Sequence, residues 1–132
     1  MPGGRGRGRR HGRRGRWAGW LDPVLLLLLH KAPAHGYTLI NQLEPFGLTE
    51  IDPSIVYRAL RNMEEQGLVI STWNEQETQG PPRRMYELTA LGDNTLQDHI
   101  QSLTNERRNI DAFLQAYEQH MNQGSGAFHE DE

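Results

Sequence analysis

A helix with two well-marked ends lies near the middle of the chain and limits what can be built around it. Asp52 and Pro53 form a typical helix start, because Asp can accept hydrogen bonds from free backbone N–H groups and Pro has no N–H to leave unpaired. Gly67 stands where a left-handed residue commonly follows a helix. Apolar side chains recur between these ends at helical spacing and must face a core: Val56, Leu60 and Met63.

The opposite face of this helix is polar and basic. Arg58 and Arg61 lie towards its N-terminus and Glu64 towards its C-terminus, an order that opposes the helix dipole. Helix stability therefore does not explain the arrangement, whereas contact with a phosphate or a base edge does. We identify four candidate nucleic-acid contacts on this face, the alternative being an ordinary solvated face with Tyr57 packed on the preceding turn: Ser54, Tyr57, Arg58 and Arg61.

Two shorter helices are expected before this one. Asp22 and Pro23 repeat the Asp-Pro start, and the run from Val24 to Leu29 is apolar on every side, which places the first helix at the centre of a core. Pro33 lies just beyond its end. A second helix is expected from about His35 to Leu43, where apolar residues recur every third position. We expect His35 and Tyr37 to serve the core and the start of this helix.

A β-hairpin is expected after the third helix. Residues 68–73 are rich in β-branched side chains and read as one strand, with Trp73 as a packing residue, and residues 85–88 read as a second strand. The connection between them contains Gly80-Pro81-Pro82 and ends on two cations, Arg83 and Arg84. The sequence therefore predicts a wing, a hairpin whose basic loop lies beside the helices.

A long helix follows, with Thr89 as its cap and its end near Met121. Its apolar residues alternate in steps of three and four, apart from one seam position that Arg107 occupies. A helix of this length cannot bury such a stripe against so small a domain, so we expect a second copy to cover it, with its N-terminal part folded back on its own core. The alternative is that the whole stripe folds back on this core. The expected dimerisation seam is Leu96, Ile100, Leu103, Ile110, Leu114, Tyr117 and Met121.

The two ends of the chain are low in complexity and opposite in charge. Half of the 14 basic residues lie at the start without any acid between them: Arg5, Arg7, Arg9, Arg10, Arg13, Arg14 and Arg16. Such an arm attracts phosphate, because each neutralised phosphate releases counterions. We expect a disordered Arg/Gly-rich arm over 1–16, a DNA-binding domain over 17–89, a dimerisation helix over 90–121 and an acidic disordered tail over 122–132.

Several classes of function find no support in the residues. The chain has no cysteine, and its longest aliphatic run is far shorter than the roughly 20 residues that cross a bilayer. No nucleophile–base pair, paired acids or phosphate-binding glycine loop is present, and the six histidines lack metal-ligand spacing. We therefore expect a non-enzymatic, cytoplasmic protein without cofactor, metal or membrane partner.

The sequence blocks resemble those of the PadR family of bacterial transcriptional regulators, in its compact subgroup with a single C-terminal dimerisation helix. The resemblance covers about residues 21–120. It rests on blocks that follow in order and at the family's spacing: LLLLL at 25–29, AHGYTLI at 34–40, DPSIVYRAL at 52–60, EEQGL at 64–68 and GPPRRMYELT at 80–89.

The resemblance implies a mainly α, α+β fold: a winged helix-turn-helix with a two-stranded wing and a long dimerisation helix. It implies a homodimeric repressor whose third helix enters the major groove of a palindromic operator, with Arg83 and Arg84 of the wing on flanking DNA. A small aromatic effector bound near the dimer interface is a further implication. The chain departs from relatives that stack planar ligands on a tryptophan of the last helix, because Trp17, Trp20 and Trp73 all lie elsewhere.

A second class of function competes with the regulator. The Arg-rich arm resembles segments that fold on RNA, so an RNA-binding or nucleoid-associated protein acting through residues 1–16 is the alternative. The two functions differ in what removal of the arm would do to sequence-specific duplex binding.

Overall fold

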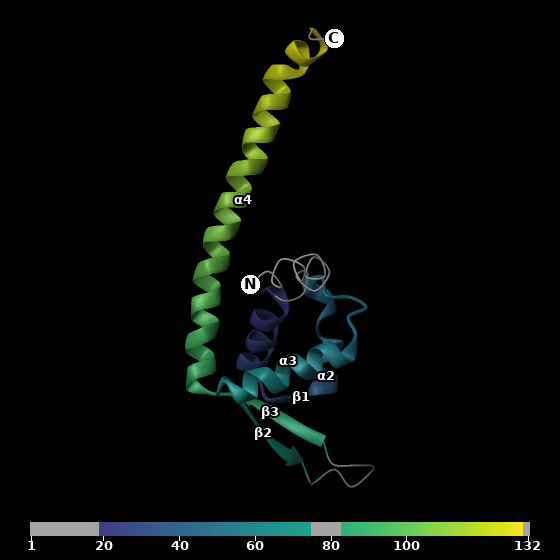
Figure 1. Ribbon diagram of the computed structural model, residues 1–132, viewed down its shortest axis with the longest axis vertical. Coiled ribbons are helices and arrows are strands. Elements are labelled where there is room, and N and C mark those ends of the chain that lie inside the picture. The colour runs from purple at the N-terminus through teal and green to yellow at the C-terminus, as the bar shows by residue number, and fades with distance from the viewer. Residues whose placement is uncertain (1–18, 75–82, 131–132) are drawn as a thin grey trace, which may run out of the picture. The chain divides into compact units, whose positions relative to one another are not determined.

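The computed structural model describes residues 19–74 and 83–130, and the chain divides into two compact units, one up to Gln97 and one from Asp98 onwards. The first unit is a set of helices with a small antiparallel sheet (Figure 1). A helix over residues 19–31 precedes the labelled elements, which are β1 (Ala34–His35), α2 (Gly36–Asn41), the 3-10 turn η1 (Glu44–Phe46), α3 (Pro53–Glu65), β2 (Val69–Asn74), β3 (Arg83–Leu88) and α4 (Ala90–Glu130). The fold is the α+β winged helix that the sequence predicted, with the long C-terminal helix.

The helix over residues 19–31 begins earlier than predicted. Asp22 and Pro23 lie within it, so Asp22 is not its N-cap. The preceding turn is helical because its side chains find partners: Leu21 is buried in the core, and Trp20 Nε1 donates a hydrogen bond to the carbonyl oxygen of Phe46 at 2.7 Å. Burial of an apolar side chain outweighs the one intrahelical hydrogen bond that Pro23 cannot make.

The second predicted helix is shorter than its apolar spacing indicated. Ala34 and His35 pair with β3 and form β1, opposite Tyr86 and Met85. His35 is also the N-cap of α2, so the helix starts one residue after the predicted start at about His35. It ends at Asn41, before the predicted end at Leu43, because the chain turns into η1 at Glu44 and Pro45, and η1 ends on Gly47 with a left-handed φ of 81°.

The third helix, α3, has the predicted ends. The side chain of Asp52 accepts a hydrogen bond from the backbone N–H of Ser54 at 3.0 Å. Gly67 adopts the left-handed conformation at φ 81°, and the N–H of Leu68 donates to the carbonyl oxygen of Met63 at 2.9 Å. These contacts satisfy backbone groups that every helix leaves unpaired at its ends.

The sheet has the order β1-β3-β2, with antiparallel pairing throughout. Both predicted strands are present: β2 lies one residue later than predicted and ends at Asn74, and β3 is longer than predicted because it begins at Arg83, the partner of Asn74. The predicted loop over 75–82 lies outside the described residues. Since side chains alternate along a strand, the pairs Ser71–Tyr86 and Trp73–Arg84 place these four residues on one face of the hairpin.

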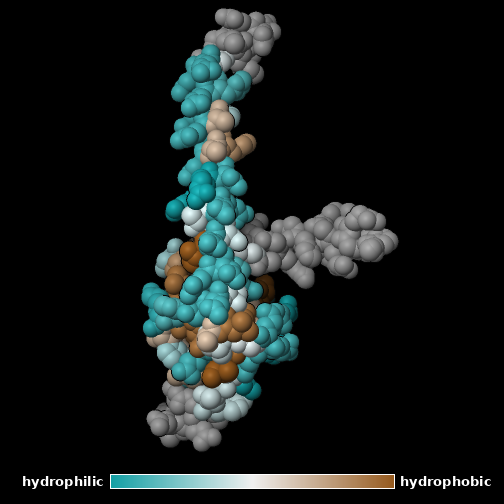
Figure 2. Space-filling view, turned by 90° about the vertical axis from the view of Figure 1, so that its left-hand side faces the viewer, coloured by the Kyte–Doolittle hydropathy of each residue, from teal (hydrophilic) through white to brown (hydrophobic). Residues whose placement is uncertain are grey.

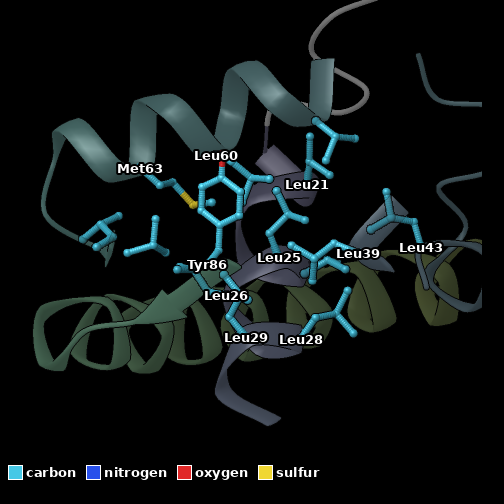
Figure 3. Close-up of a cluster of buried hydrophobic side chains, with 14 of the residues drawn as sticks. Leu21, Leu25, Leu26, Leu28, Leu29, Leu39, Leu43, Leu60, Met63 and Tyr86 are labelled. Carbon is cyan, nitrogen blue, oxygen red and sulfur yellow. The ribbon is translucent and has the colours of Figure 1, made fainter. Parts of the chain in front are cut away.

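The core of the first unit lies between the helix over 19–31, α2, α3 and the sheet. Leucines dominate it, and the ring of Tyr86 reaches from β3 towards Leu60 and Met63 of α3 (Figure 3). Its fully buried side chains are Leu25, Leu26, Leu39, Leu43, Val56, Leu60, Met63 and Val69. Leu96 also belongs to this core and is only 6% exposed, so its predicted place in the dimerisation seam is wrong: the start of the stripe folds back on its own chain.

The second unit is the part of α4 that follows Gln97. The helix continues past Met121 to Glu130, where the sequence suggested a separate tail. Leu103 is half-buried, whereas the other predicted seam residues of this unit are exposed, and Figure 2 shows apolar side chains among hydrophilic ones along this helix. Their exposed fractions run from 39% to 70% when Phe113 beside them is included: Ile100, Ile110, Phe113, Leu114, Tyr117 and Met121.

The start of α4 is locked to the end of α3. The backbone N–H of Gly92 donates to the hydroxyl of Thr89 at 3.0 Å, which confirms Thr89 as the predicted cap, and that hydroxyl donates to the carbonyl oxygen of Gly67 at 2.6 Å. Gly92 lies so close to the backbone that a Cβ there would overlap the carbonyl oxygen of Leu68. Only glycine allows this approach.

We expect Gly92→Ala to lower the free energy of unfolding by about 1–3 kcal/mol, because backbone atoms must separate to admit the methyl group. Urea denaturation measures this change. Gly19→Ala is the matched control: its Cβ position has nothing within 4 Å, so a helical alanine there should stabilise slightly. Equal stability of the two variants would contradict the packing described.

Candidate nucleic-acid interface

The four predicted contacts of α3 share its exposed face. Ser54, Tyr57, Arg58 and Arg61 are all exposed, and their spacing of three, four and seven residues puts them on one side of the helix. This side exists because Val56, Leu60 and Met63 turn the other one into the core. The structure therefore confirms that these side chains lie together at the surface.

A concave surface of about 720 Å³, here called the wing-root concavity, lies between α3 and the hairpin. Tyr57 and Arg61 reach it from α3, and Arg83 and Arg84 from β3, so it brings together four of the six predicted contacts. Ser54 and Arg58 are not part of it. Its lining is His35, Gly36, Tyr37, Tyr57, Arg61, Glu64, Trp73, Arg83, Arg84 and Tyr86.

Arg83 lies against an aromatic pair, His35 and Tyr37, that the sequence predicts to serve the core. Its guanidinium is 4.5 Å from the centre of the Tyr37 ring, and that ring stacks on His35 with centroids 5.3 Å apart. His35 is buried, and its Nδ1 lies 3.1 Å from the carbonyl oxygen of Arg84. Tyr37, by contrast, is 40% exposed, so its predicted core role is wrong: it supports a basic side chain at the surface.

Arg84 is held by a chain of polar contacts to α3. Its Nη1 donates to the hydroxyl oxygen of Ser71 at 2.6 Å, and that hydroxyl donates to Oε2 of Glu64 at 2.8 Å. The guanidinium also lies 4.5 Å from the centre of the Trp73 ring. The hydrogen bond to Ser71 therefore explains why a carboxylate lies near the end of α3, and no contact with DNA is needed to explain it.

Tyr57 packs on the start of α2 and still reaches the surface. A Cβ added to Gly36 would lie 2.5 Å from Cε1 of Tyr57, so the ring packs directly on the backbone where α2 begins. The same side chain is 38% exposed and lines the wing-root concavity. Gly36 therefore fixes the ring of Tyr57 without removing it from the surface.

The phenol of Tyr86 stands at the boundary between core and concavity. Burial raises its pKa above the ordinary value, and the carboxylate of Glu64 raises it further, while Arg84 and Arg61 act in the opposite direction. The hydroxyl therefore stays protonated and uncharged at neutral pH. The carboxylate of Glu64 and three guanidinium groups also line the concavity.

The remaining predictions on binding concern the arm, metal ions and membranes. The predicted arm, with its seven arginines, lies outside the described residues. Within residues 19–74 and 83–130 no group of three or more His, Asp and Glu side chains could hold a metal ion. No helix in the same part of the chain is long and apolar enough to cross a membrane.

The fold and this surface define a winged-helix DNA-binding protein, and comparison with known families specifies which kind. Residues 24–98, more than half of the chain, match the model of the transcriptional regulator PadR-like family. The chain belongs to this family, whose members are transcriptional regulators, and is a DNA-binding regulator by fold. No curated protein matched the chain in sequence.

Solved structures of regulators are similar to the chain. A putative transcriptional regulator from Thermoplasma acidophilum is 32% identical, with a TM-score of 0.65, over 76% of this chain and 96% of that one. A PadR-like transcription factor from Bacteroides fragilis is 28% identical, with a TM-score of 0.65, over 78% and 98%. A PadR family transcription regulator from Clostridium difficile is 25% identical, with a TM-score of 0.63, over 72% and 98%.

Proposed function

We propose that the protein is a homodimeric repressor that reads a palindromic operator with α3 and holds the flanking DNA with its wing. In this proposal Arg58 and Arg61 contact base edges in the major groove, while Ser54 and Tyr57 contact phosphates. Binding to genomic DNA is also consistent with the cytoplasmic location expected from the sequence.

One observation carries the proposal: a single concave surface joins the exposed face of α3 to the basic end of β3. Tyr57 and Arg61 come from the helix, and Arg83 from the strand that leads out of the wing. A duplex seated on α3 would therefore meet a cation on its flank. Phosphate contacts of this kind fix the register in which the bases are read.

A second copy of the chain is the proposed partner of the second unit. Leu114 and Tyr117 stay about half exposed there, and Phe113 is 70% exposed. Apolar side chains that recur in steps of three and four along one helix are typical of a helix that packs on another. Two copies related by a two-fold axis would bury the stripe and present two α3 helices to the two halves of a palindrome.

Release by a small aromatic molecule, which the family resemblance implies, would need a site built without tryptophan on the last helix. The segment Ala90–Glu130 contains none. We therefore propose repression as the function, with any effector acting through other residues.

Loss of a base contact should differ from loss of a phosphate contact. Arg61→Ala should lose roughly 1–3 kcal/mol of operator binding and relax the preference at one base pair, whereas Arg83→Ala should weaken all duplexes alike and lower the salt slope by about one. Footprinting on DNA upstream of the protein's own gene locates the operator, and fluorescence titration then measures both effects.

The matched control for these variants is Lys31→Ala, which removes one exposed cation outside the wing-root concavity. It should bind as the parent does. If Arg61→Ala bound every duplex with the affinity of the parent, the face of α3 would be the wrong surface.

A charge in the proposed seam should separate the dimer. Leu114→Glu places a carboxylate in the stripe of each copy, and we expect self-association to weaken by at least about tenfold, because both charges lose water at the interface. Sedimentation velocity measures the shift. Gln119→Glu, at the heptad position furthest from the seam, adds the same charge as a control and should stay dimeric; a monomeric parent would contradict the proposal.

Removal of residues 1–16 decides between the regulator and the RNA-binding alternative. For the regulator, the shortened chain should keep its operator preference and show only a shallower salt dependence, since the arm adds phosphate contacts and no base contacts. Titration of operator, unrelated duplex and single-stranded RNA measures the difference. Complete loss of duplex binding, with RNA binding lost as well, would favour the alternative.

A further inference from the structure

The two arginines that begin β3 are neighbours in sequence but have different partners. Arg83 lies over the Tyr37 ring, and the resemblance gives both arginines the same role on DNA. Arg84 is engaged with Ser71 and the Trp73 ring. Because their partners differ, the two arginines can have different roles in the interface.

The serine hydroxyl is the link between the wing and α3. A hydroxyl has one proton to donate and lone pairs to accept, so Ser71 can serve Glu64 and Arg84 at once, as the 2.8 Å and 2.6 Å contacts require. Both outer partners are charged, which makes the two hydrogen bonds stronger than neutral ones. The chain of contacts therefore ties the last turn of α3, where Glu64 lies, to both strands of the hairpin.

Glu64 stands in the same row of α3 as the proposed DNA contacts. Tyr57, Arg61 and Glu64 follow one another at four and three residues, and all three line the wing-root concavity. A free carboxylate there would repel a phosphate backbone. The guanidinium of Arg84, joined to it through Ser71, offsets that charge and leaves Arg61 and Arg83 as the outward cations of the concavity.

We propose that Arg84 is a positioning residue, and that the Glu64–Ser71–Arg84 chain fixes the angle between the DNA-reading helix and the wing. The proposal rests on the function proposed above. Arg83 binds phosphate, whereas Arg84 sets the geometry in which base and phosphate contacts are made together. Loss of the chain should therefore lower affinity for the operator much more than affinity for DNA in general.

Ser71→Ala tests this role without changing any charge. We expect operator affinity to fall by roughly 3- to 10-fold, the effect of two hydrogen bonds lost at one hydroxyl, while affinity for unrelated duplex and the salt slope stay as in the parent. Ser71→Thr keeps the hydroxyl and should restore operator binding. A stability change alone would not alter the ratio of operator to unrelated-duplex affinity in folded protein.

Arg84→Lys keeps the charge, but a lysine cannot hold Ser71 and stack on Trp73 in the way a planar guanidinium does. Arg108→Lys is the matched control, because Arg108 is an exposed arginine of α4 outside the wing-root concavity. We expect Arg84→Lys to resemble Ser71→Ala and Arg108→Lys to stay close to the parent, with circular dichroism melts confirming that each variant is folded at the assay temperature.

Binding by the parent and by the variants distinguishes failure of the positioning role from failure of the proposed function. If the parent binds its operator and Ser71→Ala binds equally well, the positioning role is overturned. If Arg84→Ala lowers the salt slope by about one, as Arg83→Ala should, Arg84 is a phosphate contact and the inference is also overturned. If the parent binds no duplex, the proposed function fails, and the positioning role fails with it.

Discussion

The packing of α3 on the leucine-rich helix over residues 19–31 supports every other part of the first unit. Leu25 and Leu26 are fully buried, and Leu60 of α3 is buried with them (Figure 3). Full burial of one such side chain contributes about 1.5–3 kcal/mol, whereas a typical hydrogen bond contributes a net 0.5–1.5 kcal/mol. Apolar burial therefore decides which face of α3 turns inward, and the polar face stays at the surface as a consequence.

Polar contacts fix the part of the hairpin that apolar burial does not hold. Tyr86 anchors the hairpin in the core, but the end of the hairpin at Asn74 and Arg83 lies at the surface, where few apolar side chains can hold it. There the hydroxyl of Ser71 and the ring of Tyr37 each hold one arginine. The geometry of the interface thus depends on a small number of contacts, each open to single-residue tests.

The last helix serves two parts of the molecule. Its first turns belong to the first unit, through the Thr89 cap, the close approach of Gly92 and the buried side chain of Leu96. Beyond Gln97 the same apolar stripe continues, and Leu114 and Phe113 are exposed there. One repeating pattern therefore yields core in one unit and a proposed subunit interface in the other.

Local signals in the sequence were sufficient for the ends of α3, its inward and outward faces, the two strands and the cap at Thr89, because backbone geometry and helical spacing act over a few residues. Tertiary contacts decided the rest. His35, predicted as the start of a helix, pairs with β3, and Leu96, predicted for the seam, packs in the core. The partners of Glu64 could not be predicted from the sequence either, because Ser71 and Arg84 reach it only after the hairpin has folded against α3.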